Sequence, residues 1–168
     1  QLPRTGWMDI NCSHSSKTEI VPCSLIHLIK AWSLTAEKSI PTFLGHQHRV
    51  AKFATDIARE LCYSDEQLQA IFSAALLHDI GRSWQPRELW ENDRSLTTAE
   101  WELVKKHPES SYTILRTIPF PWDIANIVYQ HHERLDGTGY PQQLGCDDIL
   151  HEAKILAVAD AIDAMLTP

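Results

Sequence analysis

The chain has 168 residues, of which 43% are hydrophobic, and this excludes a disordered composition and suffices for one domain with a packed core. Its formal net charge of −7 excludes the basic surface with which proteins bind long nucleic acids irrespective of sequence. No apolar run approaches the ~18 to 20 residues that span a membrane, and no basic region followed by an apolar stretch opens the chain. We therefore expect a soluble, cytoplasmic protein.

The first residues differ from the rest of the chain. Residues 1–23 mix prolines, a glycine and a polar run without clear periodicity, which indicates an N-terminal extension or linker. From Leu25 onward, apolar residues recur at helical spacing, so residues 24–168 are expected to form the domain. No alternating pattern long enough for a strand occurs. The predicted fold class is all-α.

Several helix starts are marked by local sequence. A helix is expected to begin near His46, where apolar residues at helical spacing follow. The segments 64–67 and 97–100 resemble capping boxes, in which a side chain before the helix and one in its first turn satisfy each other's backbone N–H groups. Pro108 can begin a further helix, and apolar positions between 122 and 128 predict the next one.

Donor groups stand at the end of an apolar helix in the middle of the chain. Residues 74–81 place His78 and Asp79 after an apolar run that Gly81 can terminate. A nitrogen and a carboxylate donor therefore lie together on one rigid element. Residues 83–96 are irregular, and we favour a plain connector there over a loop that covers a site.

The run His-His-Glu-Arg-Leu-Asp-Gly-Thr-Gly-Tyr-Pro at 131–141 is the strongest functional signal. Neutral imidazole binds divalent cations, and glycine lets backbone approach a ligand, so His131 and His132 suit a metal site that opens onto a pocket. Adjacent histidines also occur on solvated surfaces, so the run alone leaves both interpretations open.

Further donors favour the metal site. Residues 155–165 are predicted to form a buried helix that carries Asp160 and Asp163, three positions apart. A carboxylate in such an apolar stretch needs a partner, and a cation is the simplest one. His46 and His107 supply more imidazoles near the ends of predicted helices.

Together, these motifs resemble the HD-GYP branch of the HD phosphohydrolase superfamily, bacterial enzymes that hydrolyse the second messenger cyclic di-GMP. The resemblance covers roughly residues 25–168 and implies a compact multi-helix HD-domain bundle with a metal centre in its helical core. The matching elements, in order, are His46 with Arg49-Val50, His78-Asp79-Ile80-Gly81, His107-Pro108-Glu109, His131-His132-Glu133 with Asp136-Gly137-Thr138-Gly139-Tyr140-Pro141, and Val158-Ala159-Asp160 with Asp163-Ala164-Met165.

The resemblance also implies a pair of divalent ions. The expected ligands are His46, His78 and Asp160 mainly for one ion, His107, His131 and His132 mainly for the other, and Asp79 as a bridging and catalytic residue. Such mixed ligands suit iron or manganese, with zinc as a further candidate, and iron is the first choice from the family. Some family members support a third metal with a carboxylate at the position of Thr42, so two metals are expected here.

Further roles follow from the same resemblance. Arg82 replaces the family's usual lysine and should hold a substrate phosphate, while a proton-transfer role is not expected of it. Tyr140 should lie beside a guanine or shape the turn, and Gly137 and Gly139 should permit the loop. Asp163 is predicted to orient a ligand or a water during catalysis. As alternatives, Arg82 can pair with a surface carboxylate, Tyr140 can simply pack, and Asp163 can bond local backbone.

The resulting prediction is a metal-dependent phosphodiesterase that opens cyclic di-GMP to pGpG and onward to GMP, using hydroxide that two metals generate near neutral pH. One alternative is an HD hydrolase of another nucleotide. The other is a catalytically weak regulatory module that binds a cyclic dinucleotide or a protein. Three departures from the family motivate this alternative, namely Arg82, Thr42 and an expected C-terminal truncation at Pro168. The family usually continues beyond this point into a basic segment. The resemblance also implies contact with a diguanylate cyclase domain.

Overall fold

The computed structural model describes residues 23–38, 40, 43–91 and 94–167, which are helical with connecting turns and contain no strand. The helices are α1 (Cys23–Lys38), α2 (His46–Glu60), α3 (Asp65–Leu77), α4 (Thr98–Val104), α5 (His107–Leu115), α6 (Ile124–Tyr129) and α7 (His151–Leu166), with the short 3-10 helices η2 (Ile80–Trp84) and η3 (Arg87–Leu89) after α3. The predicted all-α class is confirmed. The expected extension, apart from Cys23, and Thr42 lie outside the described residues.

Both capping boxes predicted from the sequence are confirmed. The Ser64 hydroxyl accepts the backbone N–H of Gln67, and the Gln67 side chain accepts the backbone N–H of Ser64. Thr97 and Glu100 form the same reciprocal pair at the start of α4. Helices α2 and α5 also begin at the histidines near which the sequence predicted helix starts.

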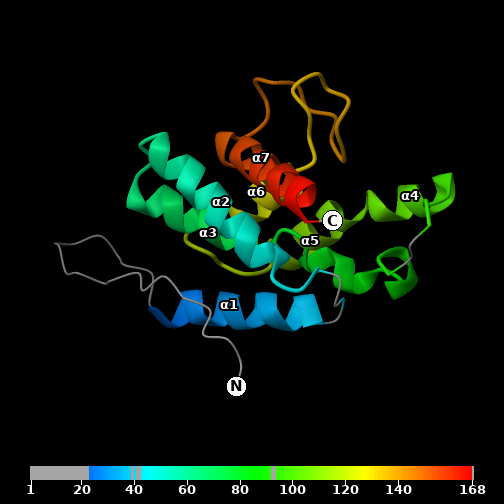
Figure 1. Cartoon of the computed structure of the whole chain (residues 1–168). Coiled ribbons are helices and arrows are strands. Elements are labelled where there is room, and N and C mark those ends of the chain that lie inside the picture. Colours follow the sequence, from blue (N-terminus) through cyan, green and yellow to red (C-terminus); the bar gives the residue numbers. More distant parts are fainter. Residues whose placement is uncertain (1–22, 39, 41–42, 92–93, 168) are drawn as a thin grey trace.

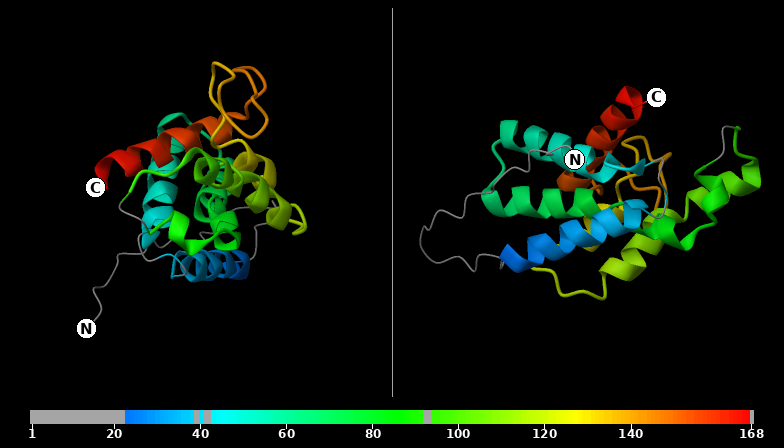
Figure 2. Two further views of the ribbon diagram at one scale, coloured as in Figure 1. Left: turned by 90° about the vertical axis from the view of Figure 1, so that its right-hand side faces the viewer. Right: turned by 60° about the horizontal axis from the view of Figure 1, so that its bottom comes forward.

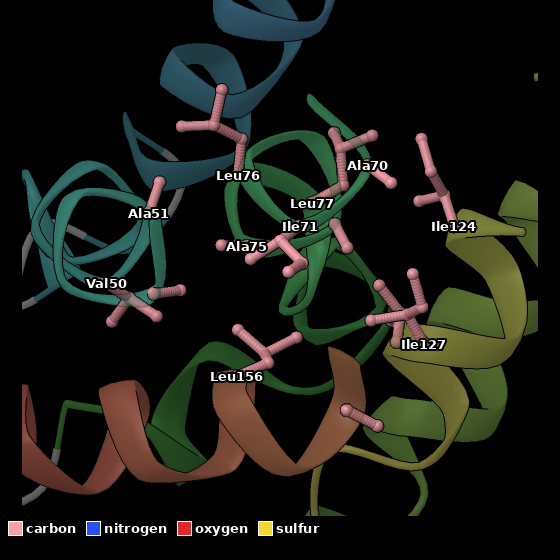
Figure 3. Packing of buried hydrophobic residues seen from close by; sticks show 14 of the residues in the cluster. Val50, Ala51, Ala70, Ile71, Ala75, Leu76, Leu77, Ile124, Ile127 and Leu156 are labelled. Atoms are coloured by element: carbon pink, nitrogen blue, oxygen red, sulfur yellow. The ribbon is translucent and has the colours of Figure 1, made fainter. Parts of the chain in front are cut away.

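Helix α3 is the central helix of the bundle. It contacts α1, α2, α6 and α7, and most of its second half, from Ala70 to Leu77, is buried. Figure 3 shows aliphatic side chains of α3 meeting those of α2, α6 and α7, among them Ile71, Val50 and Leu156. Burial of this apolar surface is the main stabilising contribution to the fold. Because His78 and Asp79 directly follow α3, the core carries them into the centre of the molecule.

The remaining elements surround this core asymmetrically. Helices α1 and α2 both pack against α3, and α7 packs across α2 (Figure 1). Helix α4 lies away from the core at one end, and the loop between α6 and α7 stands out from the bundle (Figures 1 and 2). In the part of the chain that the structure describes, no helix has both the length and the apolar character that a membrane span requires.

Gly81 does not terminate α3, which corrects the expectation from the sequence. Helix α3 already ends at Leu77, and Gly81 lies within η2. A Cβ atom at Gly81 would lie 2.3 Å from the carbonyl oxygen of His107 and 2.5 Å from the backbone nitrogen of Ser111. Ser111 accepts the N–H of Gly81 and donates its hydroxyl to the carbonyl of His78. The glycine is therefore needed for the close approach of α5 to the end of α3.

Candidate metal centre

A carboxylate from α1 fixes the start of α2, and with it His46. Glu37 Oε2 accepts the N–H of Gly45 at 2.9 Å, and Oε1 accepts the N–H of Gln47 at 2.8 Å. The first N–H groups of a helix have no partner within it, and a negative charge there is favourable. Glu37 is buried, and its role has no local sequence signal because this cap comes from another helix.

Hydrogen bonds to the backbone set the orientation of the buried imidazoles. The bonds run from His78 Nδ1 to Ala75 O at 2.8 Å, from His107 Nδ1 to Val104 O at 2.8 Å, and from His131 Nδ1 to Val128 O at 2.5 Å. A carbonyl oxygen can only accept, so Nδ1 must carry the proton and Nε2 keeps its lone pair. This is the tautomer in which Nε2 can bind a metal ion.

His46 is oriented by a carboxylate instead. Its Nδ1 donates to Asp163 Oδ2 at 2.8 Å, across the interface between α2 and α7. Arg49 donates to the same carboxylate, from Nε to Oδ1 at 2.7 Å and from Nη2 to Oδ2 at 3.0 Å. Asp163 thus binds side chains of α2 rather than its own backbone, while its predicted catalytic role stays a prediction. The contribution of Arg49 was not identified from the sequence.

One group of donors gathers around the Nε2 atoms of His46 and His78. The Oδ2 atom of Asp79 lies 3.4 Å from His46 Nε2 and 3.2 Å from His78 Nε2. Asp160, from α7, places Oδ1 at 3.3 Å from His46 Nε2 and 3.8 Å from His78 Nε2. The structure therefore brings together the side chains predicted to hold the first ion.

A second group is formed by His107, His131 and His132. The Nε2 atom of His107 lies 3.4 Å from that of His131 and 3.2 Å from that of His132. Asp79 faces this group with its other oxygen, because Oδ1 lies 3.3 Å from His107 Nε2. One carboxylate thus stands between the two groups, as a bridging ligand must.

These donors suit a divalent cation. In each group, ligand atoms from three residues lie within 4.8 Å of one another. Among the described residues, His46 Nε2, His78 Nε2 and Asp79 Oδ2 are buried without a hydrogen-bond partner. Buried polar atoms without partners are costly, and convergent lone pairs repel each other unless a cation lies between them. The cluster is therefore compatible with divalent metal binding.

Burial and charge control the protonation of the cluster. Burial lowers the pKa of both His107 and His131 to about 3, which keeps these imidazoles neutral at pH 7. Burial also lowers the pKa of His46, but the carboxylates of Asp160, Asp79 and Asp163 outweigh it and raise the pKa to about 10. For Asp79, burial raises the pKa, yet the charges of Arg82 and His78 hold it well below its usual range.

The glycine-containing loop after His132 is fastened by Glu133. The buried Glu133 carboxylate accepts the backbone N–H groups of Gln142, Gln143 and Leu144 at 2.6, 3.2 and 2.9 Å. A Cβ atom at Gly139 would lie 2.4 Å from the backbone nitrogen of Arg134, so only glycine fits there. Gly137 has a φ of 75°, in the left-handed region that glycine adopts without strain.

Tyr140 and Arg82, both predicted to contact substrate, lie beside different residues of the cluster. The Tyr140 ring is 4.9 Å from the His132 ring and tilted by 30°. The Arg82 side chain pairs with Asp79, from Nε to Oδ1 at 2.8 Å, and packs against both Phe43 and Trp90. Because Trp90 reaches this site, the expectation that residues 83–96 form a plain connector is wrong. The substrate contacts themselves stay predictions.

Comparison with known proteins agrees with this geometry. A family model described as "HD domain" matches residues 31–168. The chain belongs to the HD domain family. This HD domain is 35% identical over 139 residues to the 3'3'-cGAMP-specific phosphodiesterase 3 of Vibrio cholerae, covering 82% of this chain and 30% of the relative. It is 38% identical over 121 residues to the cyclic di-GMP phosphodiesterase response regulator RpfG of Xanthomonas campestris, covering 71% and 32%.

A solved structure supports the same assignment. The HD domain superposes on an HDG"Y"P protein from Bdellovibrio bacteriovorus with a TM-score of 0.64 and 30% identity, over 73% of this chain and 40% of that one. The predicted resemblance to the HD-GYP branch is therefore confirmed. The chain spans about a third of the length of the two curated relatives.

Proposed function

We propose that this HD domain, formed by residues 24–168, hydrolyses a phosphodiester bond of a cyclic dinucleotide in a metal-dependent reaction. The observation that carries the proposal is the position of Asp79, whose two oxygens face imidazoles of both donor groups at 3.2–3.4 Å. The substrate class is supported by the relatives, which are named as phosphodiesterases of cyclic di-GMP and 3'3'-cGAMP.

In this proposal the donor groups hold two divalent ions. His46, His78 and Asp160 would bind one ion, and Asp79 would bind both. The other ligands of the second ion would be His107, His131 and His132. Bound there, the cations would neutralise phosphodiester oxygens and lower the pKa of a bound water. Iron is the first candidate, with manganese and zinc as alternatives.

The chain's own residues would orient both the ligands and the substrate. Asp163 and the backbone carbonyls hold each bonded imidazole with Nε2 toward the centre. Tyr140 lies beside His132, so a dinucleotide that reaches this histidine would meet the tyrosine ring, and we assign the ring to a guanine contact. Gly137, Gly139 and Glu133 would keep the loop in the shape that presents this ring.

Incubation of the chain with cyclic di-GMP after loading with iron, manganese or zinc tests the proposal. Chromatography should separate the cyclic substrate from the linear dinucleotide and from GMP, and the linear dinucleotide should accumulate first. Asp79→Asn should abolish the product. Absence of product with every metal would reject the proposal for this chain. Tight binding of cyclic di-GMP without product would indicate a regulatory module.

A second candidate substrate is 3'3'-cGAMP. Its support is the 35% identity to a phosphodiesterase specific for this nucleotide, over 82% of the chain. Parallel assays with both cyclic dinucleotides give the preference as a ratio of kcat/KM values. Cleavage onward to GMP and contact with a diguanylate cyclase domain are further proposals that rest on the family resemblance.

A further inference from the structure

The guanidinium group of Arg82 is contacted by two aromatic rings. Its central carbon lies 4.4 Å from the ring centroid of Phe43 and 4.4 Å from that of Trp90. The two rings also meet edge to face, with their centroids 5.8 Å apart. Phe43 precedes α2 and Trp90 follows η3, so separate segments build this arrangement. We call Phe43, Arg82 and Trp90 the Arg82 clamp.

The Arg82 clamp touches both donor groups. The Phe43 ring lies 5.7 Å from the His46 ring, and the Trp90 ring lies 6.1 Å from the His107 ring. Arg82 itself pairs with Asp79, the carboxylate between the groups. The clamp therefore contacts one imidazole of each group and the residue that joins them.

The burial of Arg82 needs compensation, and the clamp provides it. The side chain is 11% exposed, and its Nη1 atom is buried without a hydrogen-bond partner. The charge of Asp79 and the electron-rich faces of the two rings stabilise such a cation. A planar, weakly hydrated guanidinium packs on aromatic faces more readily than a compact, strongly hydrated ammonium. The two rings thus suit an arginine rather than the lysine usual in the family.

We propose that Arg82 is a positioning residue, held by Phe43 and Trp90 so that it fixes the Asp79 carboxylate between the two donor groups. This role replaces the phosphate contact predicted from the sequence, because Nε already meets Asp79. The inference rests on the proposed function for its catalytic consequence. Its structural consequence, the placement of Asp79 for a metal ion, is independent of any substrate.

Variants that keep the charge of Arg82 but loosen the clamp test the proposal. Arg82→Lys retains the cation and loses the planar group, while Trp90→Leu and Phe43→Leu each remove one ring. Trp90→Phe keeps an aromatic face and should rescue. Trp84→Leu is the matched control, because Trp84 ends η2 and is 63% exposed.

The first readout is the affinity for Mn²⁺ or Zn²⁺ alone, measured by competition with a chelator. Arg82→Lys, Trp90→Leu and Phe43→Leu should each weaken metal binding about tenfold, within the range found for groups that orient metal ligands. Trp90→Phe should stay within about threefold of the wild type because its ring still faces the cation. Circular dichroism and melting temperature check that each variant folds, and Arg82→Lys decides alone if the others do not.

The second readout is the division of the effect between kcat and KM for cyclic di-GMP. A positioning residue lowers kcat and leaves KM unchanged, whereas a phosphate contact raises KM. A raised KM with unchanged metal affinity in Arg82→Lys would overturn the proposal, and so would unchanged metal affinity in all loosened variants. A wild-type chain that binds metal without turning over cyclic di-GMP contradicts the proposed function instead, and the metal affinities then still decide the clamp.

Discussion

His46 and Asp163 are 117 positions apart in the sequence and are joined by a hydrogen bond of 2.8 Å from Nδ1 to Oδ2. The bond directs the other nitrogen of the imidazole at Asp79 and Asp160. It therefore links the packing of α7 on α2 to the geometry of the metal centre.

Asp163→Asn should weaken metal binding about tenfold, because groups that orient metal ligands contribute on this scale. Both His46 and Arg49 donate to this side chain, and an amide offers them one accepting oxygen instead of two. Chelator competition measures the affinity, with the exposed Asp147→Asn as the control. An affinity equal to that of the wild type would show that the bond does not control His46.

Gly139→Ala should disrupt the loop, because its Cβ atom would lie 2.4 Å from the backbone nitrogen of Arg134. We expect loss of turnover together with faster hydrogen exchange of the amides of residues 142–144, whose N–H groups donate to Glu133. Gly145→Ala is the matched control in the same loop, since its nearest neighbour would be Asp148 Oδ2 at 4.0 Å. Equal behaviour of the two alanine variants would contradict the steric argument.

Glu133→Gln should destabilise the chain by about 1–3 kcal/mol, the usual cost of leaving buried hydrogen-bonding groups unsatisfied. The carboxylate now accepts from the backbone N–H groups of residues 142, 143 and 144, and an amide nitrogen in place of one oxygen cannot accept. Urea unfolding measures the change, with the exposed Glu109→Gln as the control. A free energy of unfolding that matches the control would refute this account of the loop.

Glu37→Gln should lower stability by about 1–2 kcal/mol, which is typical for the loss of a helix cap. The variant should also weaken metal binding, because the N–H groups of Gly45 and Gln47 flank His46. Glu60→Gln, at the exposed other end of α2, should change neither property. Lost stability with unchanged metal affinity would mean that the cap supports the helix without positioning the histidine.

The gathering of the ligands could be anticipated from the sequence. His78, Asp79 and Asp160 stand in or beside strongly apolar helices, where polar groups need partners, and the capping boxes mark helix starts locally. These signals are contained in short stretches of chain. They predicted which side chains would converge, although the ions themselves stay a prediction.

The supporting groups could not be predicted in this way. Glu37 caps a helix that it does not belong to, and Trp90 meets Arg82 only after the segment around η3 folds back on the site. Gly81 was expected to end a helix, but its role follows from the approach of α5, which has no local signature. Such contacts depend on tertiary packing between segments that the sequence pattern does not align.

The metal content of the chain tests the central claim most directly. After loading with iron, manganese or zinc and removal of free metal, elemental analysis of the wild type should find about two ions per chain. Asp79→Asn, which alters the carboxylate between the donor groups, should retain fewer. If the folded wild-type chain retains no ion with any of the three metals, the convergent side chains are not a metal centre and the proposed hydrolysis is contradicted.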